Sequence, residues 1–196
     1  MAEIVQANRC PWCAQYGEHI RYHDEEWGVK VEDDLKWFEF LTLDAFQAGI
    51  SWLTILRKRE GFKRAFSGFD PELIAKYDEK KIQSLLADEK IIRNQLKIRA
   101  TVSNAAAFLN LQEQHGSFNN YIWRFTEGST LHHSFTHPGE VPVSTPLSDA
   151  ISKDLKNNRF KFVGTTIIYA FMQAAGMVND HLVSCYRYEQ ICQQCP

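Results

Sequence analysis

Residues 163–176, VGTTIIYAFMQAAG, run directly into residues 177–185, MVNDHLVSC. The first stretch is apolar nearly all round, which predicts a helix buried on most sides. The second stretch places His181 four residues before Cys185, and imidazole and thiolate are both common zinc ligands. These two side chains either pack beside each other, as buried free cysteines commonly do, or form half of a metal site.

The other half of such a site is expected in the irregular N-terminal region. Cys10 stands in RCPWC and His23 in YHDEEWG. Two cysteines and two histidines around one Zn²⁺ would form a closed tetrahedral site, which is structural and leaves no position for a reacting water. The expected clamp joins residues of about 10–23 to residues 181–185.

A rival arrangement uses only cysteines. Cys10 and Cys13 form CPWC, and Cys192 and Cys195 form CQQC near the end of the chain. This pairing has the more familiar CxxC spacing of zinc sites. The residues alone leave both arrangements open.

The rest of the chain indicates an all-α fold with about eight or more helices, because period-two alternation is scarce. A central buried helix is expected over 35–47, with Gly49 able to stop it. Short helices are expected over 70–92, where Pro71 suits a helix start, and a longer one over 96–115 that Gly116 ends. Thr145-Pro146 is a typical helix entry.

Composition indicates one domain over residues 1–196. Hydrophobic residues make up 44% and charged residues 23% of the chain, as in ordinary globular proteins. The formal net charge of −2 excludes a global positive field, so DNA contact would need a local basic patch. No apolar run approaches the length of a membrane span, and residues 1–10 lack the pattern of a signal peptide, so we expect a cytoplasmic protein whose five cysteines are thiols or metal ligands.

One acidic residue stands out in the expected central helix. Asp44 lies within FLTLDAFQAGISW, where its charge opposes the helix dipole and burial among aromatic residues costs free energy. Such misplaced carboxylates often mark functional sites, although a thin solvated stripe is the alternative. Trp52 follows beyond the Gly49 break. A carboxylate and an indole beside one turn predict a slot for a planar ligand.

Two basic clusters are candidates for a DNA surface. One comprises Arg57, Lys58, Arg59, Lys63 and Arg64, and the other comprises Arg93, Lys97 and Arg99. The second cluster lies between two helical patterns, so a helix–hairpin–helix over about 79–112 could bind a phosphate through backbone N–H groups. The usual glycine-rich hairpin is missing, and solvated helix faces are the alternative for either cluster.

Four segments in this order resemble one family. They are YHDEEWGV (22–29), FQAGISWLTILRKRE (46–60), IIRNQLKI (91–98) and FKFVGTTIIYAFMQAAGMVNDHLVSC (160–185). Together they closely resemble 3-methyladenine DNA glycosylase I, of the helix–hairpin–helix glycosylase superfamily, from about Cys10 to Cys185. The resemblance implies an all-α, helix–hairpin–helix DNA glycosylase-like fold with a zinc clamp joining the N- and C-terminal regions.

The resemblance also implies an activity. It implies a monomeric, monofunctional enzyme that flips 3-methyladenine out of double-stranded alkylated DNA and hydrolyses its N-glycosidic bond, leaving an abasic site. One structural zinc would be held by Cys10, His23, His181 and Cys185, so Cys13, Cys192 and Cys195 would remain free thiols. The alternatives are a zinc-stabilised DNA- or protein-binding module with little or no glycosylase activity, and a metal hydrolase.

Matching positions supply the expected site residues. Tyr22 and Trp52 match the aromatic residues of the base pocket. Asp44 stands where the family typically has a catalytic Glu, and His19 stands where it often has a base-binding Tyr. With the shorter Asp44, either the backbone compensates or base binding is weakened, and His19 leaves the second wall of the slot open, so a shifted base preference or a lower activity is the expected consequence. The expected DNA contacts are Gln47, Gly49, Ile50, Arg93, Lys97, Gly164 and Thr165.

Overall fold

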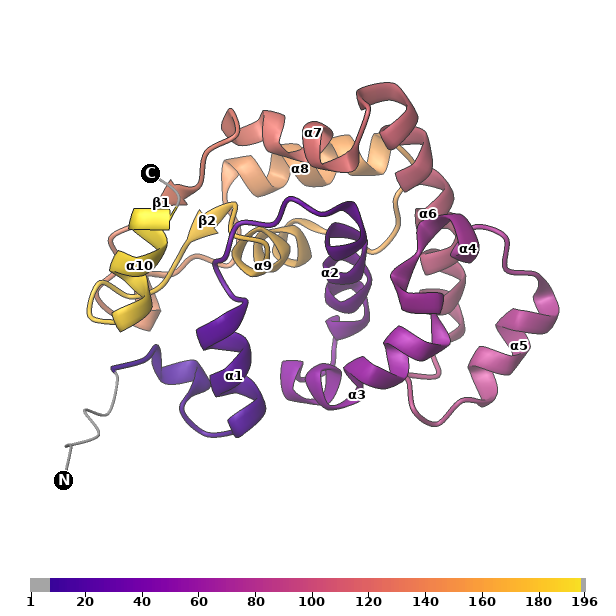
Figure 1. Ribbon diagram of the computed structural model, residues 1–196, viewed down its shortest axis with the longest axis horizontal. Coiled ribbons are helices and arrows are strands. Elements are labelled where there is room, and N and C mark those ends of the chain that lie inside the picture. The colour runs from indigo at the N-terminus through magenta and orange to yellow at the C-terminus, as the bar shows by residue number, and fades with distance from the viewer. Residues whose placement is uncertain (1–7, 195–196) are drawn as a thin grey trace.

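The computed structural model describes residues 8–194, which form ten α-helices and four short 3-10 helices (Figure 1). The α-helices are α1 (Gly17–Glu25), α2 (Asp34–Gln47), α3 (Trp52–Ala65), α4 (Pro71–Ile74), α5 (Glu79–Ala87), α6 (Gln95–His115), α7 (Phe118–Trp123), α8 (Pro146–Asn157), α9 (Thr165–Ala174) and α10 (Tyr186–Gln194). The 3-10 helices are η1 (Pro11–Cys13), η2 (Ser67–Phe69), η3 (Arg124–Thr126) and η4 (Pro138–Glu140). The expected helices are present with closely matching bounds.

The structure adds a small sheet that the sequence did not predict. Strands β1 (Leu131–His132) and β2 (Val178–Asn179) run parallel, with Leu131 paired to Val178 and His132 paired to Asn179. Two residues are too few to show an alternating pattern in sequence. The fold is therefore mostly helical, and the sheet fastens the loop after η3 to the segment after α9.

Helix α2 lies at the centre of the molecule and packs against α3, α6, α7 and α9. Asp33 caps it by accepting a hydrogen bond from the Leu35 amide. Trp37, Phe40 and Phe46 of α2 are fully buried, and burying each such side chain contributes about 1.5–3 kcal/mol. The sequence expectation of a central buried helix is confirmed.

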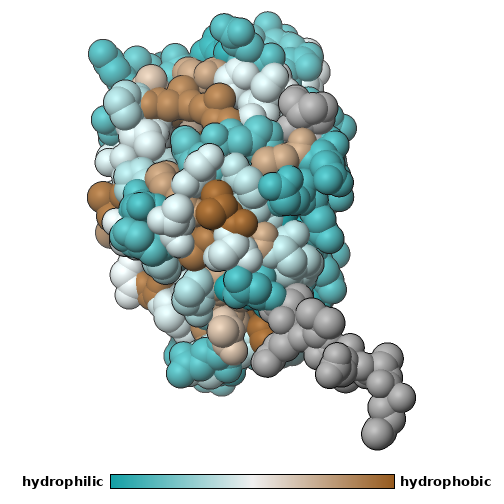
Figure 2. Space-filling view, turned by 90° about the vertical axis from the view of Figure 1, so that its left-hand side faces the viewer, coloured by the Kyte–Doolittle hydropathy of each residue, from teal (hydrophilic) through white to brown (hydrophobic). Residues whose placement is uncertain are grey.

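The two ends of the described chain meet on one side of the molecule. The Asn8 side chain donates to the Ser184 carbonyl at 2.7 Å, and the Tyr186 amide donates to the Asn8 carbonyl at 2.9 Å. Figure 2 shows the face where α1 and α10 lie as largely hydrophilic, with separate small apolar patches. No helix within residues 8–194 has the length and apolar character to cross a membrane.

Residues 180–185 form a turn between β2 and α10, so His181 and Cys185 do not lie on a helix as their spacing could indicate. Helix α9 ends at Ala174, and Gly176 follows with φ of 72°. A Cβ on Gly176 would lie 2.5 Å from the Val29 carbonyl carbon, so only glycine fits where the chain turns past the N-terminal region. This close approach brings the candidate ligands to the N-terminal segment.

Candidate functional site

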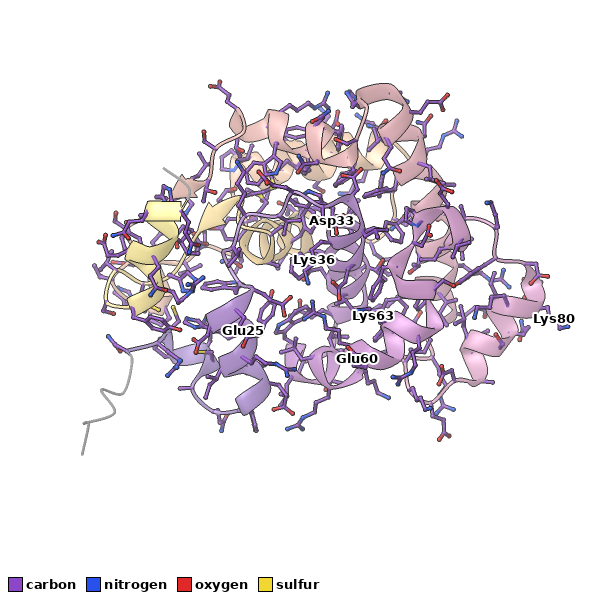
Figure 3. The ribbon with its side chains drawn as sticks, viewed as in Figure 1. Glu25, Asp33, Lys36, Glu60, Lys63 and Lys80 are labelled. Atoms are coloured by element: carbon purple, nitrogen blue, oxygen red, sulfur yellow. The ribbon has the colours of Figure 1, made fainter. Side chains whose placement is uncertain are left out.

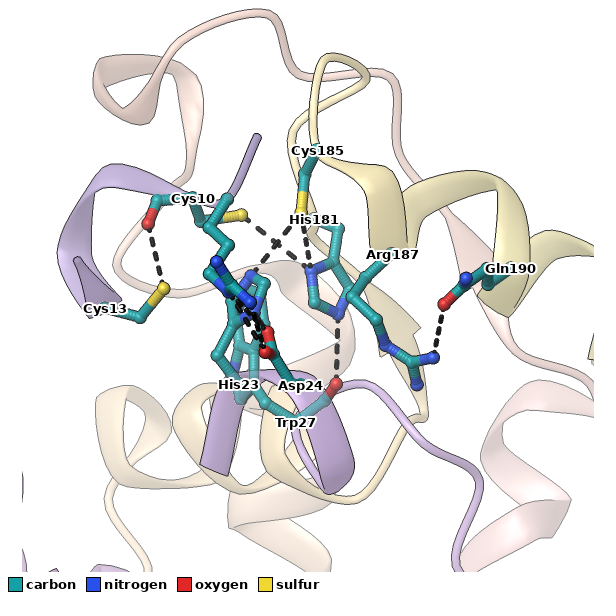
Figure 4. A network of polar contacts seen from close by, with 10 residues as sticks. Cys10, Cys13, His23, Asp24, Trp27, His181, Cys185, Arg187 and Gln190 are labelled. Atoms are coloured by element: carbon teal, nitrogen blue, oxygen red, sulfur yellow. Dashed lines mark hydrogen bonds and ion pairs between the residues drawn. The ribbon is translucent and has the colours of Figure 1, made fainter. Parts of the chain in front are cut away.

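Four buried side chains meet where the two chain ends come together (Figure 4). The ligand atoms of Cys10, His23, His181 and Cys185 all lie within 4.8 Å of one another. The Cys185 sulfur is 3.4 Å from Nε2 of His23 and 3.6 Å from Nδ1 of His181. The Cys10 sulfur is 3.8 Å from Nδ1 of His181. With ordinary Zn–S and Zn–N bonds, sulfur and nitrogen ligands of a tetrahedral zinc lie about 3.6 Å apart, so the spacing fits one Zn²⁺.

Hydrogen bonds outside the cluster orient both imidazoles. Nδ1–H of His23 donates to Asp24 at 2.8 Å, and Nε2–H of His181 donates to the Trp27 carbonyl at 3.0 Å. Arg9 in turn binds Asp24 at 2.8 and 2.9 Å. Although burial opposes the shift, hydrogen bonds from Arg9 and His23 lower the pKa of Asp24 to about 2. Each histidine therefore presents its other nitrogen, with a free lone pair, to the cluster, as metal-binding histidines do.

The contact between the two cysteines of the cluster favours the thiolate form of Cys185. The hydrogen bond from Cys10 lowers the pKa of Cys185, and the same pairing raises the pKa of Cys10. Thiolate is the form that binds metal. The donor set, its spacing and its oriented imidazoles all suit zinc.

The rival four-cysteine arrangement is not supported. The Cys13 thiol points back to the Cys10 carbonyl at 3.1 Å, and the Cys192 sulfur lies 3.5 Å from Nδ1 of His132, away from the cluster. Cys13 and Cys192 are free thiols, as expected, and Cys195 lies outside the described residues.

A cavity of about 290 Å³ lies beside the cluster. It is bounded by α1, α2, α3, α9, η1 and the segment around η4. Its lining includes Tyr22, Asp44, Gln47 and Trp52, which the sequence predicted, and also Cys10, Pro11, Trp12, Trp27, Pro138, Val141, Ala170, Gln173, Asp180 and Leu182. This is the small end of the usual range for ligand sites, and it suits a single planar base better than a nucleotide.

Asp44 carries a buried, unpaired oxygen in this cavity. It is 3% exposed, and its Oδ2 atom has no hydrogen-bond partner among residues 8–194. Burial raises the pKa of Asp44 well above its usual value. A buried acceptor without a partner costs about 1–3 kcal/mol, so a ligand that donates to this oxygen would recover that loss.

Tyr22 and Trp52 form an aromatic wall on the same cavity. Their ring centroids are 5.1 Å apart, with 59° between the planes. The Trp52 indole Nε1–H is buried and likewise has no partner within the described chain. The cavity thus offers aromatic surface, a buried unsatisfied acceptor on Asp44 and a buried unsatisfied donor on Trp52.

His19 is not among the residues that line the cavity, and its role in base binding stays a prediction. Its ring packs edge-on against Trp12 at 5.7 Å and against Tyr16 at 5.8 Å. His19 lies nearly one turn before Tyr22 on the same face of α1, and neither of its ring nitrogens has a hydrogen-bond partner within residues 8–194. Trp12, which does line the cavity and meets the Tyr22 ring at 6.3 Å, supplies the second aromatic wall.

Sequence reasoning missed four lining residues with clear chemistry: Trp12, Trp27, Gln173 and Asp180. The two tryptophans lie within CPWC and EEWG, and five tryptophans in one chain was the available signal. Gln173 is a polar residue in an otherwise apolar helix, the feature that revealed Asp44. Asp180 was obscured by the candidate ligand His181 beside it.

The turn after α2 lies at the rim of the cavity. The Ile50 amide donates to the Gln47 carbonyl at 2.6 Å, and exposed Gly49 has φ of 77°. Ser51 then caps α3 by accepting from the Thr54 amide at 3.3 Å. The expected DNA contacts Gln47, Gly49 and Ile50 are therefore adjacent to the base-sized cavity.

Lys97 does not face solvent, which corrects its expected role as a phosphate contact. It is 6% exposed, and its ammonium donates to the carbonyls of Phe46 at 2.9 Å and Ala48 at 2.6 Å. Desolvation lowers its pKa. A cation at the C-terminus of a helix is favoured by the helix dipole, so Lys97 caps α2.

The other expected DNA contacts remain accessible. The Arg93 side chain is 52% exposed, with Glu89 at 3.7 Å. Gly164 is the N-cap of α9 and Thr165 is its first residue, and the Thr165 hydroxyl lies 2.8 Å from that of Ser148. These positions keep their role as predictions.

Acidic residues neutralise much of both basic clusters. Arg59 binds Glu26 and Glu39 at 2.6–2.8 Å, and these ion pairs raise its pKa although burial opposes the rise. In the second cluster, Arg99 binds Glu79 at 2.7 Å. Figure 3 shows Glu25, Lys36, Glu60 and Lys63 among the side chains of α1, α2 and α3. These four residues line a hollow of about 700 Å³ that carries both signs of charge. The two clusters are therefore weaker DNA surfaces than the sequence indicated.

The comparisons with known proteins agree with one another, because each finds a methyladenine glycosylase. A family model described as methyladenine glycosylase matches residues 12–188. The chain is 45% identical over 180 residues to DNA-3-methyladenine glycosylase 1 of Escherichia coli (strain K12), covering 92% of this chain and 96% of that protein. It is 41% identical over 177 residues to DNA-3-methyladenine glycosylase of Haemophilus influenzae, covering 90% and 96%.

A solved structure has the same fold. The 3-methyladenine DNA glycosylase I of Staphylococcus aureus superimposes with a TM-score of 0.90 at 31% identity, covering 93% of this chain and 97% of that one. The similarity thus extends over nearly the whole of each protein.

Proposed function

The chain belongs to the methyladenine glycosylase family, and from this premise we propose that it is a DNA glycosylase that excises 3-methyladenine from alkylated DNA. The single observation that carries the proposal is the base-sized cavity in which buried Asp44 lies unpaired beside Tyr22 and Trp52. Those groups match what a flipped, positively charged purine needs. The reaction breaks the N-glycosidic bond and leaves an abasic site.

The chemistry asks little of the protein beyond binding. Methylation at N3 gives the adenine ring a positive charge, so its bond to deoxyribose is already weak and the leaving base needs no proton, unlike the leaving group of an ordinary glycosidase. No lysine lines the cavity in the part of the chain that the structure describes. Water is therefore the nucleophile, and the enzyme is a monofunctional hydrolase.

The positive charge of the methylated base favours its binding over that of unmodified adenine. The faces of Trp52 and Tyr22 attract a cationic ring through their quadrupoles. Burial raises the pKa of Asp44, and a cationic base beside it would lower that pKa again, so the carboxylate and the cation favour each other. Asp44 accepts a hydrogen bond from the amino group of the base. Unmodified adenine is neutral and gains less from both interactions.

The proposed zinc has a structural role. One Zn²⁺ bound by Cys10, His23, His181 and Cys185 would be closed, with no open position for water, so it would clamp the ends of a single domain and take no part in the reaction. This argues against a metal hydrolase. Of the proposed domain over residues 1–196, residues 1–7 and 195–196 lie outside the described part.

Double-stranded DNA would approach the rim of the cavity. Helices α5 and α6 with the segment 88–94 between them form the proposed helix–hairpin–helix, and Arg93 lies exposed in that segment. The free backbone N–H groups at the start of α9, near Gly164 and Thr165, can bind a second phosphate. Gln47 and Ile50 would fill the gap that the flipped nucleotide leaves. We expect the protein to act as a monomer.

A base-release assay tests the function. Duplex DNA treated with a methylating agent is incubated with the protein, the released bases are separated by chromatography, and abasic sites are counted by alkaline cleavage. Release of 3-methyladenine with an equal number of abasic sites, and none from untreated DNA, is the expected result. Binding to methylated DNA without any base release would favour a zinc-stabilised binding module instead.

A further inference from the structure

Two carboxylates line the cavity, and their surroundings differ. Asp44 has an oxygen without a partner, whereas Asp180 is 2% exposed and accepts hydrogen bonds from three donors. Nδ1 of His133 lies 2.6 Å from one oxygen of Asp180. The other oxygen accepts from the Tyr169 hydroxyl at 2.6 Å and from the Gln173 amide at 2.7 Å. Asp180 is thus a fixed part of the wall, occupied by protein donors.

Asp180 sets the orientation of the Gln173 amide. The Gln173 amide nitrogen donates to Oδ2 of Asp180 at 2.7 Å, so the NH₂ group of Gln173 faces Asp180. Its other polar atom, Oε1, then has no bond to Asp180, and the structure gives it no hydrogen bond within residues 8–194. Because the side chain lines the cavity, Oε1 is an acceptor that a bound ligand can use.

We propose that Gln173 is a specificity-determining residue for the base, with Asp180 as the positioning residue behind it. This inference rests on the proposed base excision. The 6-amino group of adenine has two N–H donors, of which Asp44 accepts one and Gln173 the other. Guanine has a 6-oxo group, which is an acceptor and would face the two acceptors of Asp44 and Gln173. The 6-oxo oxygen and both side-chain oxygens would then lack a donor, which strongly disfavours binding of guanine. The cavity therefore selects 6-amino over 6-oxo purines.

The first test replaces the acceptor. Free 3-methyladenine and 3-methylguanine are titrated by calorimetry into the zinc-loaded parent and into Gln173→Met, which keeps the length of the side chain. The parent should bind 3-methyladenine at least about tenfold more tightly than 3-methylguanine. Gln173→Met should bind 3-methyladenine about fivefold more weakly, the value of one neutral hydrogen bond, and should not lose affinity for 3-methylguanine.

The second test allows the Gln173 side-chain amide to reverse its orientation. Asn at position 180 offers both a donor and an acceptor, so in Asp180→Asn the Gln173 amide can turn over and present NH₂ to the cavity. Affinity for 3-methylguanine should then rise about fivefold, by one neutral hydrogen bond, while affinity for 3-methyladenine falls. If Asp180 had only a structural role, Asp180→Asn would bind both 3-methyladenine and 3-methylguanine more weakly than the parent. Zinc content is measured in parallel because Asp180 precedes the candidate ligand His181.

Asp154→Asn is the matched control. Asp154 also accepts a tyrosine hydroxyl, that of Tyr121 at 2.6 Å, but it does not line the cavity, so both affinities should stay at the parental values. If the ratio of the two affinities is unchanged in Gln173→Met at parental thermal stability, the role of Gln173 is overturned and base excision still stands. If the parent binds no 3-methyladenine, the two proposals fail together. Gln173→Met decides the question alone if Asp180→Asn does not fold.

Discussion

The ammonium group of Lys97 donates to the carbonyl oxygen of Ala48 at 2.6 Å, although the two residues are 49 positions apart in the chain. Lys97 stands in the first turn of α6, and Ala48 ends α2 four residues after Asp44. The helix after the proposed hairpin thus holds the end of the helix that carries the base-binding carboxylate.

Lys97→Met should therefore lower the free energy of unfolding by about 1–3 kcal/mol, because the carbonyls of Phe46 and Ala48 lose their buried donor. Urea unfolding measures the change. Lys97→Arg keeps a cation and should recover part of it. Arg93→Ala, on the exposed segment before α6, is the control and should change stability by less than about 0.5 kcal/mol. A Lys97→Met protein as stable as the parent would show that this contact is not important.

Zinc should be present at one ion per chain in carefully purified protein, as measured by elemental analysis. Structural zinc can contribute on the order of 10 kcal/mol to folding, so Cys185→Ala should lose the metal and be severely destabilised. Cys192→Ala should keep both metal and stability, because Cys192 lies outside the cluster. Metal retained in Cys185→Ala, or lost in Cys192→Ala, would contradict the assigned ligands.

Stacking on the Trp52 ring and the hydrogen bond of its indole N–H should make separable contributions to base binding. Trp52→Ala should weaken binding of free 3-methyladenine by about 1–3 kcal/mol, if values for stacked single-stranded bases apply. Trp52→Phe keeps a ring but removes the unpartnered Nε1–H, and should lose less. Calorimetric titration measures both. Equal losses in the two variants would mean that the donor, and not the stacking, provides the binding energy.

Affinity for duplex DNA should fall steeply as salt rises, because the chain as a whole is not basic and only local phosphate contacts can hold the duplex. Arg93→Ala should reduce the slope of log affinity against log salt by about one unit, and should weaken binding to all sequences alike. Fluorescence anisotropy at several salt concentrations measures this. A flat response in the parent would exclude these phosphate contacts.

Local pattern was enough to predict several parts of the site. Asp44 was visible because a carboxylate in an apolar helix breaks the pattern of its neighbours. Cys10, His23, His181 and Cys185 were identified by residue type and by resemblance, and the structure brings them together. The helix bounds followed from the apolar pattern and from signals such as Thr145-Pro146 and Gly116.

Other parts depend on contacts between distant segments. Lys97 was read as a surface cation because it stands among basic residues, and only the packing of α6 against α2 buries it. His19 was placed in the slot by its position in a motif, and the structure shows it packed on Trp12, which lines the cavity. The orientation of Gln173 requires Asp180, and that contact forms only when the segment after α9 turns back.

The central claim is that Asp44 in this cavity binds the methylated base as it is excised. Single-turnover release of 3-methyladenine from methylated duplex DNA tests it most directly, with the parent, Asp44→Asn and the control Asp154→Asn compared at equal zinc content. Asn keeps the size but turns one acceptor into a donor, and losing a hydrogen bond to a charged group costs about 1.5–3 kcal/mol. Release should be at least about tenfold slower in Asp44→Asn and unchanged in Asp154→Asn. Release by Asp44→Asn at the parental rate would contradict the account.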